Sequence, residues 1–420
     1  MIDLRLLRDD LESVRRAYAR RGGVDRLEEV VEFDAQRRDL LADVERLRAE
    51  HNRASKAIGG APPEERPAAI EAARALANRL QELEPRLEDV TKRLEEAAAY
   101  LPNLPHESVP EGLSEGENVV EREVGERAEF DFEALDHVAL GERLQLFDSE
   151  RGAKVSGSRF VYVTGLGVVL ELALVRFAMD FLFERGFTPA VPPVLVRRHA
   201  MYGTGFLPTD EQEFYRSERD ELYLTGTSEV ALAAMHADEI LSADSLPVRY
   251  AGFSSCFRRE AGTYGKETKG LIRVHQFDKV EQFSFSHPDD SWDELQAIRT
   301  NQEKILQALE IPYRVLVMCA GDLGSAAAKK VDNEAWLPGA RRYLELTSAT
   351  NATDYQARRL QIRFRAPEGT RLVHTLNGTA CAVGRTMVAL LENHQRGDGS
   401  VGIPEALRAY TGFDEIKPPG

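Results

Sequence analysis

The chain has 420 residues, which is room for two domains and a sizeable hydrophobic core. Its 54 lysines and arginines, set against 70 aspartates and glutamates, give a formal net charge of -16 at pH 7. This charge argues against a general nucleic-acid coat, so any contact with RNA has to come from a local basic patch.

The N-terminus and the cysteines predict a protein of the cytoplasm. Three aspartates fall within the first ten residues, which suits neither a signal peptide nor a transit peptide. Cys256, Cys319 and Cys381 lie far apart without metal-ligand spacing and fit a reducing compartment. The most apolar run, residues 168–187, is interrupted by charged side chains and cannot form a membrane span.

Residues 27–101 are predicted to form a long helical hairpin that is separate from the rest of the chain. Apolar side chains recur at alternating spacings of three and four, which is typical of a coiled-coil seam. They are Val30, Phe33, Leu40, Val44, Leu47, Ala54 and Ile58, then Leu76, Leu80, Leu83, Leu87, Val90, Leu94 and Leu101. The Gly-Gly-Ala-Pro-Pro stretch at residues 59–63 predicts the turn. Helices of ~30 residues would extend roughly 45 Å, too far for a compact core.

Basic side chains are spread over the polar faces of this hairpin. They are Arg38, Arg46, Arg48, Arg53, Lys56, Arg74, Arg79, Lys92 and Arg93. On composition alone, this pattern favours a solvated coiled coil with interleaved Glu–Arg pairs over an RNA-binding surface.

The next segment is predicted to be a linker that leads into a second domain. Residues 102–130 contain Pro102, Pro105 and Pro110 among glycines and glutamates. A helix is predicted for residues 170–185, followed by an extended segment at residues 187–191.

Residues 253–257 and 271–277 are predicted as two strands of a hairpin with a long loop between them. Arg258 and Glu260 follow the first strand and Phe277 ends the second. This set can hold a nucleotide, because a guanidinium binds phosphate, a carboxylate accepts from the adenine amino group and a ring stacks on the base. An amphipathic hairpin with surface ion pairs has the same pattern and stays open as an alternative.

Residues 375–393 predict a strand that runs into a buried helix. The glycines permit close approach of the backbone, and Arg385 lies at the expected start of the helix. This is a second element suited to phosphate, and it weakens the purely structural interpretation of the hairpin.

These stretches together resemble motifs two and three of class II aminoacyl-tRNA synthetases. Residues 170–191 resemble motif one, which builds the dimer interface in that class. Three further strings narrow the match: Thr-Gly-Thr-Ser-Glu at 225–229, Val-His-Gln-Phe-Asp-Lys-Val-Glu at 274–281, and Thr-Asp-Tyr-Gln-Ala-Arg-Arg at 353–359. Over essentially its whole length the chain is similar to bacterial-type seryl-tRNA synthetases.

The resemblance implies an ATP site with two catalytic arginines, Arg258 at the α-phosphate and Arg385 at the γ-phosphate. The implied ATP-binding residues are Arg258, Arg259, Glu260, Arg273, Val274, Phe277, Glu345, Leu346, Thr347, Ser348 and Arg385. The attacking carboxylate of the amino acid is already ionised, so the implied catalysis works by positioning and charge without a general base.

The resemblance also implies a Mg²⁺ site and a serine site. Glu345 and Ser348 would hold Mg²⁺, since a hard cation accepts a carboxylate, a hydroxyl and phosphate oxygens. The implied serine-binding residues are Thr227, Ser228, Glu229, Arg258, Glu281 and Thr379. A pocket that hydrogen-bonds a hydroxyl rejects alanine strongly, whereas threonine must be excluded by shape.

The partner implied for the hairpin is tRNA(Ser), whose long variable arm and elbow would be contacted at phosphate and ribose. Tyr264 and Lys266 would present the 3′ end of the tRNA. Four positions depart from the family pattern: Asn333, Leu344, Ala349 and Ala352. They leave open a duplicated, specialised copy that tolerates an antibiotic mimic of seryl-adenylate.

We therefore predict an α+β homodimer. Residues 1–105 would form a tRNA-binding domain with a long antiparallel coiled-coil arm, and residues 106–420 a catalytic domain with an antiparallel sheet flanked by helices. The predicted activity is serine--tRNA ligase, with tRNA(Sec) left open as a second acceptor. A ligase that loads a carrier protein would not need the basic arm. A non-catalytic RNA-binding scaffold would not need Arg258, Glu260 and Arg385 together.

Overall fold

A computed structural model of the chain describes residues 1–261 and 269–419, so Tyr264 and Lys266 lie outside the described residues. Two compact units are present. One comprises Ile2–Ala19 and Gly23–Pro102, and the other comprises Met1, Arg20–Gly22 and the chain from Asn103 onward. None of the helices in the described ranges combines the length and apolarity needed to cross a membrane.

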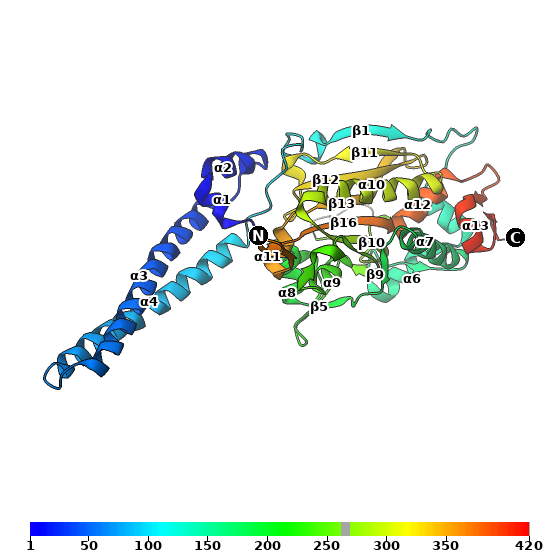
Figure 1. Cartoon of the computed structure of the whole chain (residues 1–420). Coiled ribbons are helices and arrows are strands. Elements are labelled where there is room, and N and C mark those ends of the chain that lie inside the picture. Colours follow the sequence, from blue (N-terminus) through cyan, green and yellow to red (C-terminus); the bar gives the residue numbers. More distant parts are fainter. Residues whose placement is uncertain (262–268, 420) are drawn as a thin grey trace. The chain divides into compact units, whose positions relative to one another are not determined.

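The first unit is built from two long antiparallel helices and two short ones. The short helices are α1 (Leu4–Asp9) and α2 (Leu11–Arg20), and the long ones are α3 (Leu27–Gly60) and α4 (Arg66–Ala98) (Figure 1). The long helices have 34 and 33 residues and pack side by side, which confirms the predicted hairpin. The turn begins two residues later than predicted, because α3 continues through the two glycines at its end.

The seam of this hairpin is apolar, and its base is fixed by a buried carboxylate. Val44 and Leu47 from α3 pack with Leu80 from α4 in a small core. Near the base, Arg8 donates from Nε and Nη2 to the two oxygens of Asp34 over 2.7 and 2.6 Å. Because Asp34 is 3% exposed, this ion pair lies at the boundary between α1 and the apolar seam.

The second unit is organised around an eight-stranded sheet in the order β1-β11-β12-β13-β16-β10-β9-β4. All neighbouring pairs are antiparallel except β4 with β9, which are parallel. The strands are β1 (Val119–Val124), β4 (Thr188–Ala190), β9 (Val248–Phe257), β10 (Gln276–Ser286), β11 (Tyr313–Val317), β12 (Lys329–Leu337), β13 (Arg342–Asn351) and β16 (His374–Ala382). The predicted α+β fold with a largely antiparallel sheet is confirmed (Figure 1).

Three helices cover one face of the sheet: α7 (Leu166–Phe183), α10 (Ser291–Ala308) and α12 (Val383–Asn393). Their apolar side chains form the main core together with those of the strands. At Gly378 of β16, a Cβ atom would stand 2.3 Å from Cγ2 of Ile298 in α10. A glycine is therefore needed for α10 to approach the sheet this closely.

The opposite face is covered at one end by α9 (Glu229–Ala234) and α11 (Tyr355–Leu360). There Leu232 and Leu360 pack on Phe283 and Phe285 of β10. Side chains alternate along a strand, so Phe277, residue 279 and Glu281 lie on this same face beyond the apolar cluster. That part of the face contains a polar pocket.

Shorter elements surround the sheet. The helices are α5 (His137–Leu144), α6 (Ser149–Ser156), α8 (Arg198–Thr204) and α13 (Glu405–Thr411). The strands are β2 (Phe147–Asp148), β3 (Tyr162–Val163), β5 (Leu195–Arg197), β6 (Arg216–Ser217), β7 (Leu222–Leu224), β8 (Ile240–Ser242), β14 (Arg363–Ala366), β15 (Gly369–Leu372), β17 (Val401–Gly402) and β18 (Glu415–Ile416).

Two sequence-based boundaries were wrong. The predicted linker contains β1, an edge strand whose side chains are mostly exposed and in which charged residues interrupt the valines. It is held by backbone pairing with β11. Such a strand lacks the apolar alternation that reveals strands in a sequence. The second strand of the predicted hairpin starts at Gln276 rather than at residue 271, although the antiparallel pairing of β9 with β10 is as predicted.

Candidate active site

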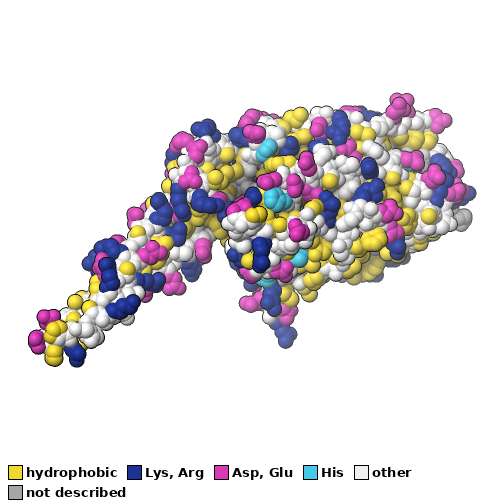
Figure 2. All heavy atoms as spheres, viewed as in Figure 1, with side chains coloured by type: hydrophobic (Ala, Val, Ile, Leu, Met, Phe, Trp, Pro, Cys, Tyr) yellow, Lys and Arg dark blue, Asp and Glu magenta, His cyan; other side chains and the backbone are white. Residues whose placement is uncertain are grey.

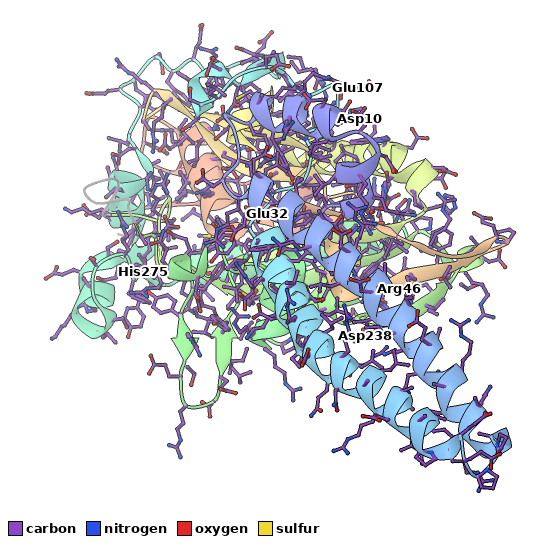
Figure 3. All side chains as sticks on the ribbon, turned by 90° about the vertical axis from the view of Figure 1, so that its left-hand side faces the viewer. Asp10, Glu32, Arg46, Glu107, Asp238 and His275 are labelled. Carbon is purple, nitrogen blue, oxygen red and sulfur yellow. The ribbon has the colours of Figure 1, made fainter. Side chains whose placement is uncertain are left out.

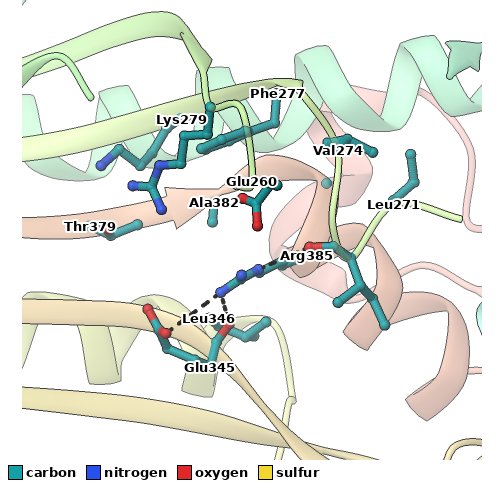
Figure 4. Close-up of a pocket in the computed structure, with 13 residues that line it drawn as sticks. Glu260, Leu271, Val274, Phe277, Lys279, Glu345, Leu346, Thr379, Ala382 and Arg385 are labelled. Atoms are coloured by element: carbon teal, nitrogen blue, oxygen red, sulfur yellow. Dashed lines mark hydrogen bonds and ion pairs between the residues drawn. The ribbon is translucent and has the colours of Figure 1, made fainter. Parts of the chain in front are cut away.

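A polar pocket opens between the end of the β9–β10 connection, the strands β10, β13 and β16, and the first turn of α12 (Figure 4). Its lining residues are Arg258, Glu260, Leu271, Ile272, Val274, Phe277, Lys279, Glu345, Leu346, Thr379, Ala382, Gly384 and Arg385. Most of the predicted ATP-binding residues are therefore neighbours in space. Residues that lie more than 100 positions apart in the chain meet here because the three strands are adjacent in the sheet.

Arg385 is the third residue of α12 and is held in the pocket from two sides. Its Nη1 donates to the backbone oxygen of Glu345 over 3.0 Å, and its Nε donates to the backbone oxygen of Ile272 over 3.3 Å. The guanidinium also lies 3.7 Å from the Glu345 carboxylate, as the dashed lines in Figure 4 show. A fixed cation at the N-terminal end of a helix suits an anionic ligand.

Arg258 and Phe277 form the other side of the pocket. The guanidinium carbon of Arg258 lies 5.4 Å from the centroid of the Phe277 ring, and Nε of Arg258 donates to the backbone oxygen of Gly226 over 3.3 Å. Close by, Nη1 of Arg273 donates to Oε2 of Glu260 over 3.1 Å. These contacts fix an aromatic face, a carboxylate and a cation within one pocket.

Glu345 lies beside the cations of the pocket, with 43% of its side chain exposed. Burial alone would raise the pKa of this carboxyl, but the nearby cations of Lys330, Arg385 and Arg258 hold it below its usual value. The arrangement keeps a carboxylate in a pocket that otherwise collects positive charge.

A bulge in β13 changes which residues share a face with Glu345. Glu345 is opposite Glu334, whereas Thr347 is opposite Asn333, so Leu346 is an extra residue in the strand. As a result Glu345 and Ser348 lie on the same face, although residues three apart in a regular strand point to opposite faces. Spacing alone could not have shown this.

Two members of the predicted ATP-binding segment have other roles in the structure. Thr347 is buried and accepts a hydrogen bond from Nδ2 of Asn333 over 2.9 Å, so its side chain is used inside the sheet. This contact also explains how the polar Asn333 is accommodated at a buried position. Ser348 lies directly opposite the buried Asp332 across β13 and β12. No cluster of three or more His, Cys, Asp or Glu side chains with metal-binding geometry occurs in the described parts of the chain.

The predicted serine residues meet at the inner end of the pocket. Nζ of Lys279 donates to Oγ1 of Thr227 over 2.7 Å and forms an ion pair with Oε2 of Glu281. Oγ1 of Thr379 donates to the same oxygen of Glu281 over 3.3 Å. Glu281 and Thr379 are direct neighbours across β10 and β16, which explains why residues 98 apart in sequence form this contact.

Glu229 is a second carboxyl group beside this cluster. It is buried at the first position of α9, and Nε2 of Gln356 donates to its Oε1 over 2.7 Å. Burial, followed by the negative charge of Glu281, raises the pKa of Glu229 to about 7. A buried carboxyl group with a strongly raised pKa is typical of functional pockets.

Two other predicted site residues do not line the pocket in the described structure. The hydroxyl of Ser228 is fully buried and donates to the backbone oxygen of Gly252 over 3.4 Å, so it fastens the loop to β9. Arg259 makes a backbone hydrogen bond to the oxygen of Glu213 over 2.9 Å. Both assignments stay predictions.

Sequence reasoning missed two residues of the site, Lys279 and Gln356. Lys279 is two positions before Glu281 in the same strand, so the period of a strand would have placed the two side chains on one face. Gln356 lies in a segment that had been singled out for the resemblance, but no local pattern shows that its amide reaches Glu229.

Comparison with known proteins agrees with this geometry. Residues 212–394 match the family described as tRNA synthetase class II core domain (G, H, P, S and T), and residues 1–105 match the Seryl-tRNA synthetase N-terminal domain. The chain is 49% identical to the serine--tRNA ligases of Acidothermus cellulolyticus and Thermobifida fusca. The alignments cover 100% of this chain and 100% and 99% of those proteins.

Solved structures give the same result. The structure is similar to that of seryl-tRNA synthetase from Pyrococcus horikoshii complexed with ATP, with a TM-score of 0.96, 44% identity and 100% coverage of both chains. It is also similar to the cytoplasmic serine-tRNA ligase from Naegleria fowleri in complex with AMP, with a TM-score of 0.90, 31% identity and coverage of 100% and 99%. The chain therefore belongs to the seryl-tRNA synthetase family, the serine--tRNA ligases among the class II aminoacyl-tRNA synthetases.

Proposed function

We propose that this chain activates L-serine with ATP and transfers the seryl group from the adenylate to the 3′ end of tRNA(Ser). The observation that carries the proposal is the continuity of one pocket. Arg258 and Arg385 supply positive charge at its open end, and Thr379 and Lys279 line the end where the buried carboxylates lie. Such a pocket holds a polyphosphate and a small zwitterion next to each other.

ATP is placed by residues at the outer part of the pocket. The Glu260 carboxylate, steadied by Arg273, accepts from the adenine amino group, and the Phe277 ring stacks on the base. Arg258 neutralises the α-phosphate and Arg385 the γ-phosphate. The backbone of Val274 completes the adenine site.

Mg²⁺ is part of the proposal, and the residues present fit it. Glu345 is kept ionised by its surroundings, and the bulge in β13 brings Ser348 to the same face. A carboxylate and a hydroxyl would hold the ion, which in turn neutralises phosphate charge. Glu345 would then exchange part of its contact with Arg385 for the metal.

L-serine is bound at the inner end by Thr227, Glu229, Glu281 and Thr379, with its carboxylate toward Arg258. The carboxylate of Glu281 accepts from the substrate hydroxyl or ammonium group. Alanine would leave these buried polar groups without a partner, which is costly, so the pocket discriminates against it. The chain's task is to hold the serine carboxylate in line with the α-phosphate while Arg258 offsets the charge of the transition state.

The arm is proposed to bind tRNA(Ser) through phosphate and ribose. The nine basic residues identified on its polar faces are all exposed, and dark blue side chains run along the arm in Figure 2. Figure 3 shows side chains projecting outward along both helices, with Arg46 and Glu32 marking α3. Within the described residues, Lys56, Arg74 and Arg79 have no carboxylate partner.

A cytoplasmic homodimer completes the proposal. Large apolar side chains are exposed on α7 at Leu166, Val168, Leu172 and Phe183, and a second copy of the chain would cover them. The three cysteines are free and buried, which agrees with a reducing compartment.

The decisive test is serine-dependent exchange of pyrophosphate into ATP, measured against a panel of amino acids, followed by charging of tRNA(Ser). We expect exchange with serine alone, and a KM for serine that rises more than the KM for ATP in Thr379→Ala and Glu281→Ala. Preference for another amino acid, or transfer to a carrier protein in place of tRNA, would contradict the proposal. The same charging assay with tRNA(Sec), and inhibition by a seryl-adenylate mimic, test the second acceptor and the specialised copy.

A further inference from the structure

We propose that Lys279 is a positioning residue of the amino-acid pocket, whose ammonium group fixes the carboxylate of Glu281 as the acceptor for L-serine and whose charge also acts on the neighbouring carboxyl group of Glu229. The inference rests on the proposed function of the pocket and names a residue that acts through Glu281. It is carried by the geometry of one buried cation between two carboxyl groups.

Lys279 is a buried lysine whose ammonium group is paired with residues of the proposed serine site. Its side chain is 7% exposed, and its ammonium group bridges Oγ1 of Thr227 and the carboxylate of Glu281. A buried ammonium without such partners would lose several kcal/mol of hydration, so its position is strongly determined. The bridge also joins the loop before α9 to β10, which are 52 residues apart in sequence.

Because Lys279 binds one carboxylate oxygen of Glu281, the other oxygen is left for the ligand. Oε2 forms the ion pair with Nζ of Lys279 and accepts the hydrogen bond from the hydroxyl of Thr379. Among the described residues, the hydrogen bond and the ion pair of Glu281 both involve Oε2, and Oε1 has no partner there. With Oε2 fixed, Oε1 is held in one orientation as the acceptor for the hydroxyl or the ammonium group of serine.

Titratable and charged groups from β9, β10, β13 and α9 surround Lys279. They are Glu281 on β10, Glu229 at the start of α9, Cys256 on β9, Arg258 after β9 and Glu345 on β13. Burial raises the pKa of the Cys256 thiol, so this group stays neutral. The charge of the inner pocket is therefore set by one lysine and two glutamates.

The two glutamates are not equivalent, because only one of them is paired with the lysine. Glu229 has an amide partner instead, and its pKa is raised to about 7 by burial and by the charge of Glu281, while the positive charge of Lys279 acts in the opposite direction. Ionisation of Glu229 therefore adds one negative charge to this cluster as the pH rises through about 7. Serine approaches with a positive ammonium group, so the deprotonated form of Glu229 binds it better.

The test is the pH dependence of kcat/KM for serine in pyrophosphate exchange, with Lys279→Met and Lys279→Arg compared with the unmodified full chain. The unmodified protein should show kcat/KM rising with pH through an inflection near 7. Lys279→Met keeps the length of the side chain but removes the cation. We expect a KM for serine raised by about tenfold or more and a KM for ATP changed by less than about threefold.

The inflection should also move to higher pH in Lys279→Met, because the cation that favours ionised Glu229 is gone. Lys279→Arg should restore most of the affinity for serine and return the inflection toward its original pH. A lysine that only braces the loop would raise both KM values together and leave the inflection where it is. That result would overturn the inference.

A second variant keeps the inference testable if Lys279→Met does not fold. In Glu229→Gln the inflection near pH 7 should disappear, while exchange with serine persists at a level that does not depend on pH in this range. An inflection that persists in Glu229→Gln would also overturn the inference. Failure of the proposed function looks different, because the unmodified protein would then activate an amino acid other than serine.

Discussion

Charged residues are used in opposite ways in the arm and in the pocket. In the arm, Arg48 of α3 and Glu84 of α4 lie 2.6 Å apart with side chains that are 59% and 44% exposed. In the pocket, the paired side chains of Lys279 and Glu281 are 7% and 2% exposed. An exposed pair contributes about 0–1 kcal/mol, whereas removing one partner of a buried pair costs about 3–5 kcal/mol.

This difference in burial between the ion pairs of the arm and those of the pocket decides how each region responds to substitution. In the arm, many weak and solvated charges act by their sum, so each single one is replaceable. In the pocket, each charge faces a specific partner at low dielectric, so the removal of one changes the charge of its neighbours. The largest effects are therefore expected in the pocket and the smallest at single residues of the arm.

Arg258→Ala should reduce pyrophosphate exchange by about a thousandfold or more. A single preorganised donor to the transition state is worth about 10²–10³ in rate, and a charged one more. Arg259→Ala is the matched control, because Arg259 is the adjacent arginine and lies outside the pocket lining. We expect it to retain exchange within about tenfold. Near-normal exchange in folded Arg258→Ala would remove Arg258 from the catalytic role.

Replacement of residues 35–95 by a short Gly-Ser turn should abolish charging of tRNA(Ser) and leave pyrophosphate exchange nearly unchanged. The apolar seam of the arm is satisfied internally by residues such as Val44, Leu47 and Leu80. Every residue of the proposed ATP and serine sites lies beyond position 220. Exchange and charging are measured on the same preparation. Intact charging by the armless protein would show that the tRNA is bound elsewhere.

The two regions also differ in how far the sequence predicted them. The arm follows from heptad spacing, a signal contained within about seven residues, and both helices are present as predicted. In the pocket, the resemblance correctly brought together Arg258, Glu260, Phe277, Glu345 and Arg385. Ser228 and Arg259 are not among the lining residues, and their assignments stay predictions.

Several features that sequence reasoning missed depend on contacts between elements that are distant in the chain. The bulge that brings Ser348 to the face of Glu345 is set by the register of β13 on β12, which no local spacing encodes. The amide of Gln356 reaches Glu229 from a helix more than 100 residues away in the chain. β1 was missed because backbone pairing, and not a buried face, holds this edge strand in place.

One ion pair at the base of the arm, Arg8 with Asp34, includes a buried carboxylate. It allows the effect of burial to be tested in the arm itself, apart from the pocket. Asp34 is 3% exposed and forms an ion pair with Arg8. Burial alone would raise the pKa of Asp34, but the positive charges of Arg8, Arg38 and Arg37 hold this pKa below its usual value. A lowered pKa in the folded state stabilises the fold above the pKa of the unfolded chain, and this contribution is lost as the pH falls through the folded value.

Asp34→Asn should therefore destabilise the arm at pH 7 by about 1–3 kcal/mol, as measured by thermal or urea unfolding followed by circular dichroism. Asp43→Asn is the control, since Asp43 pairs with Arg46 on the exposed surface of α3, and it should cost less than about 1 kcal/mol. The difference between the two variants should shrink as the pH falls below the usual pKa range of an aspartate and the carboxyl group of Asp34 takes up a proton. Equal costs for both variants at pH 7 would mean that burial does not distinguish these pairs.

The smallest effects are expected for single basic residues of the arm. Lys56, Arg74 and Arg79 are exposed and have no carboxylate partner in the described structure, so they are free to bind phosphate. Each alanine substitution should weaken binding of tRNA(Ser) only about two- to fivefold, because one exposed charge contributes little. The triple variant should lower the slope of log Kd against log salt by up to about 0.9 for each phosphate that the arm no longer neutralises.

The matched control is the triple alanine variant of Arg46, Arg48 and Arg93, whose charges are already paired with Asp43, Glu84 and Asp89. Each triple variant removes three cations, so the net charge of the arm changes by the same amount in both. If only the summed charge of the arm matters, the two variants will show the same decrease in affinity for tRNA(Ser) and the same decrease in salt slope. If the unpaired cations bind the phosphates, the slope will decrease in the first variant alone, because counterion release follows the phosphates that are neutralised and not the overall charge of the protein.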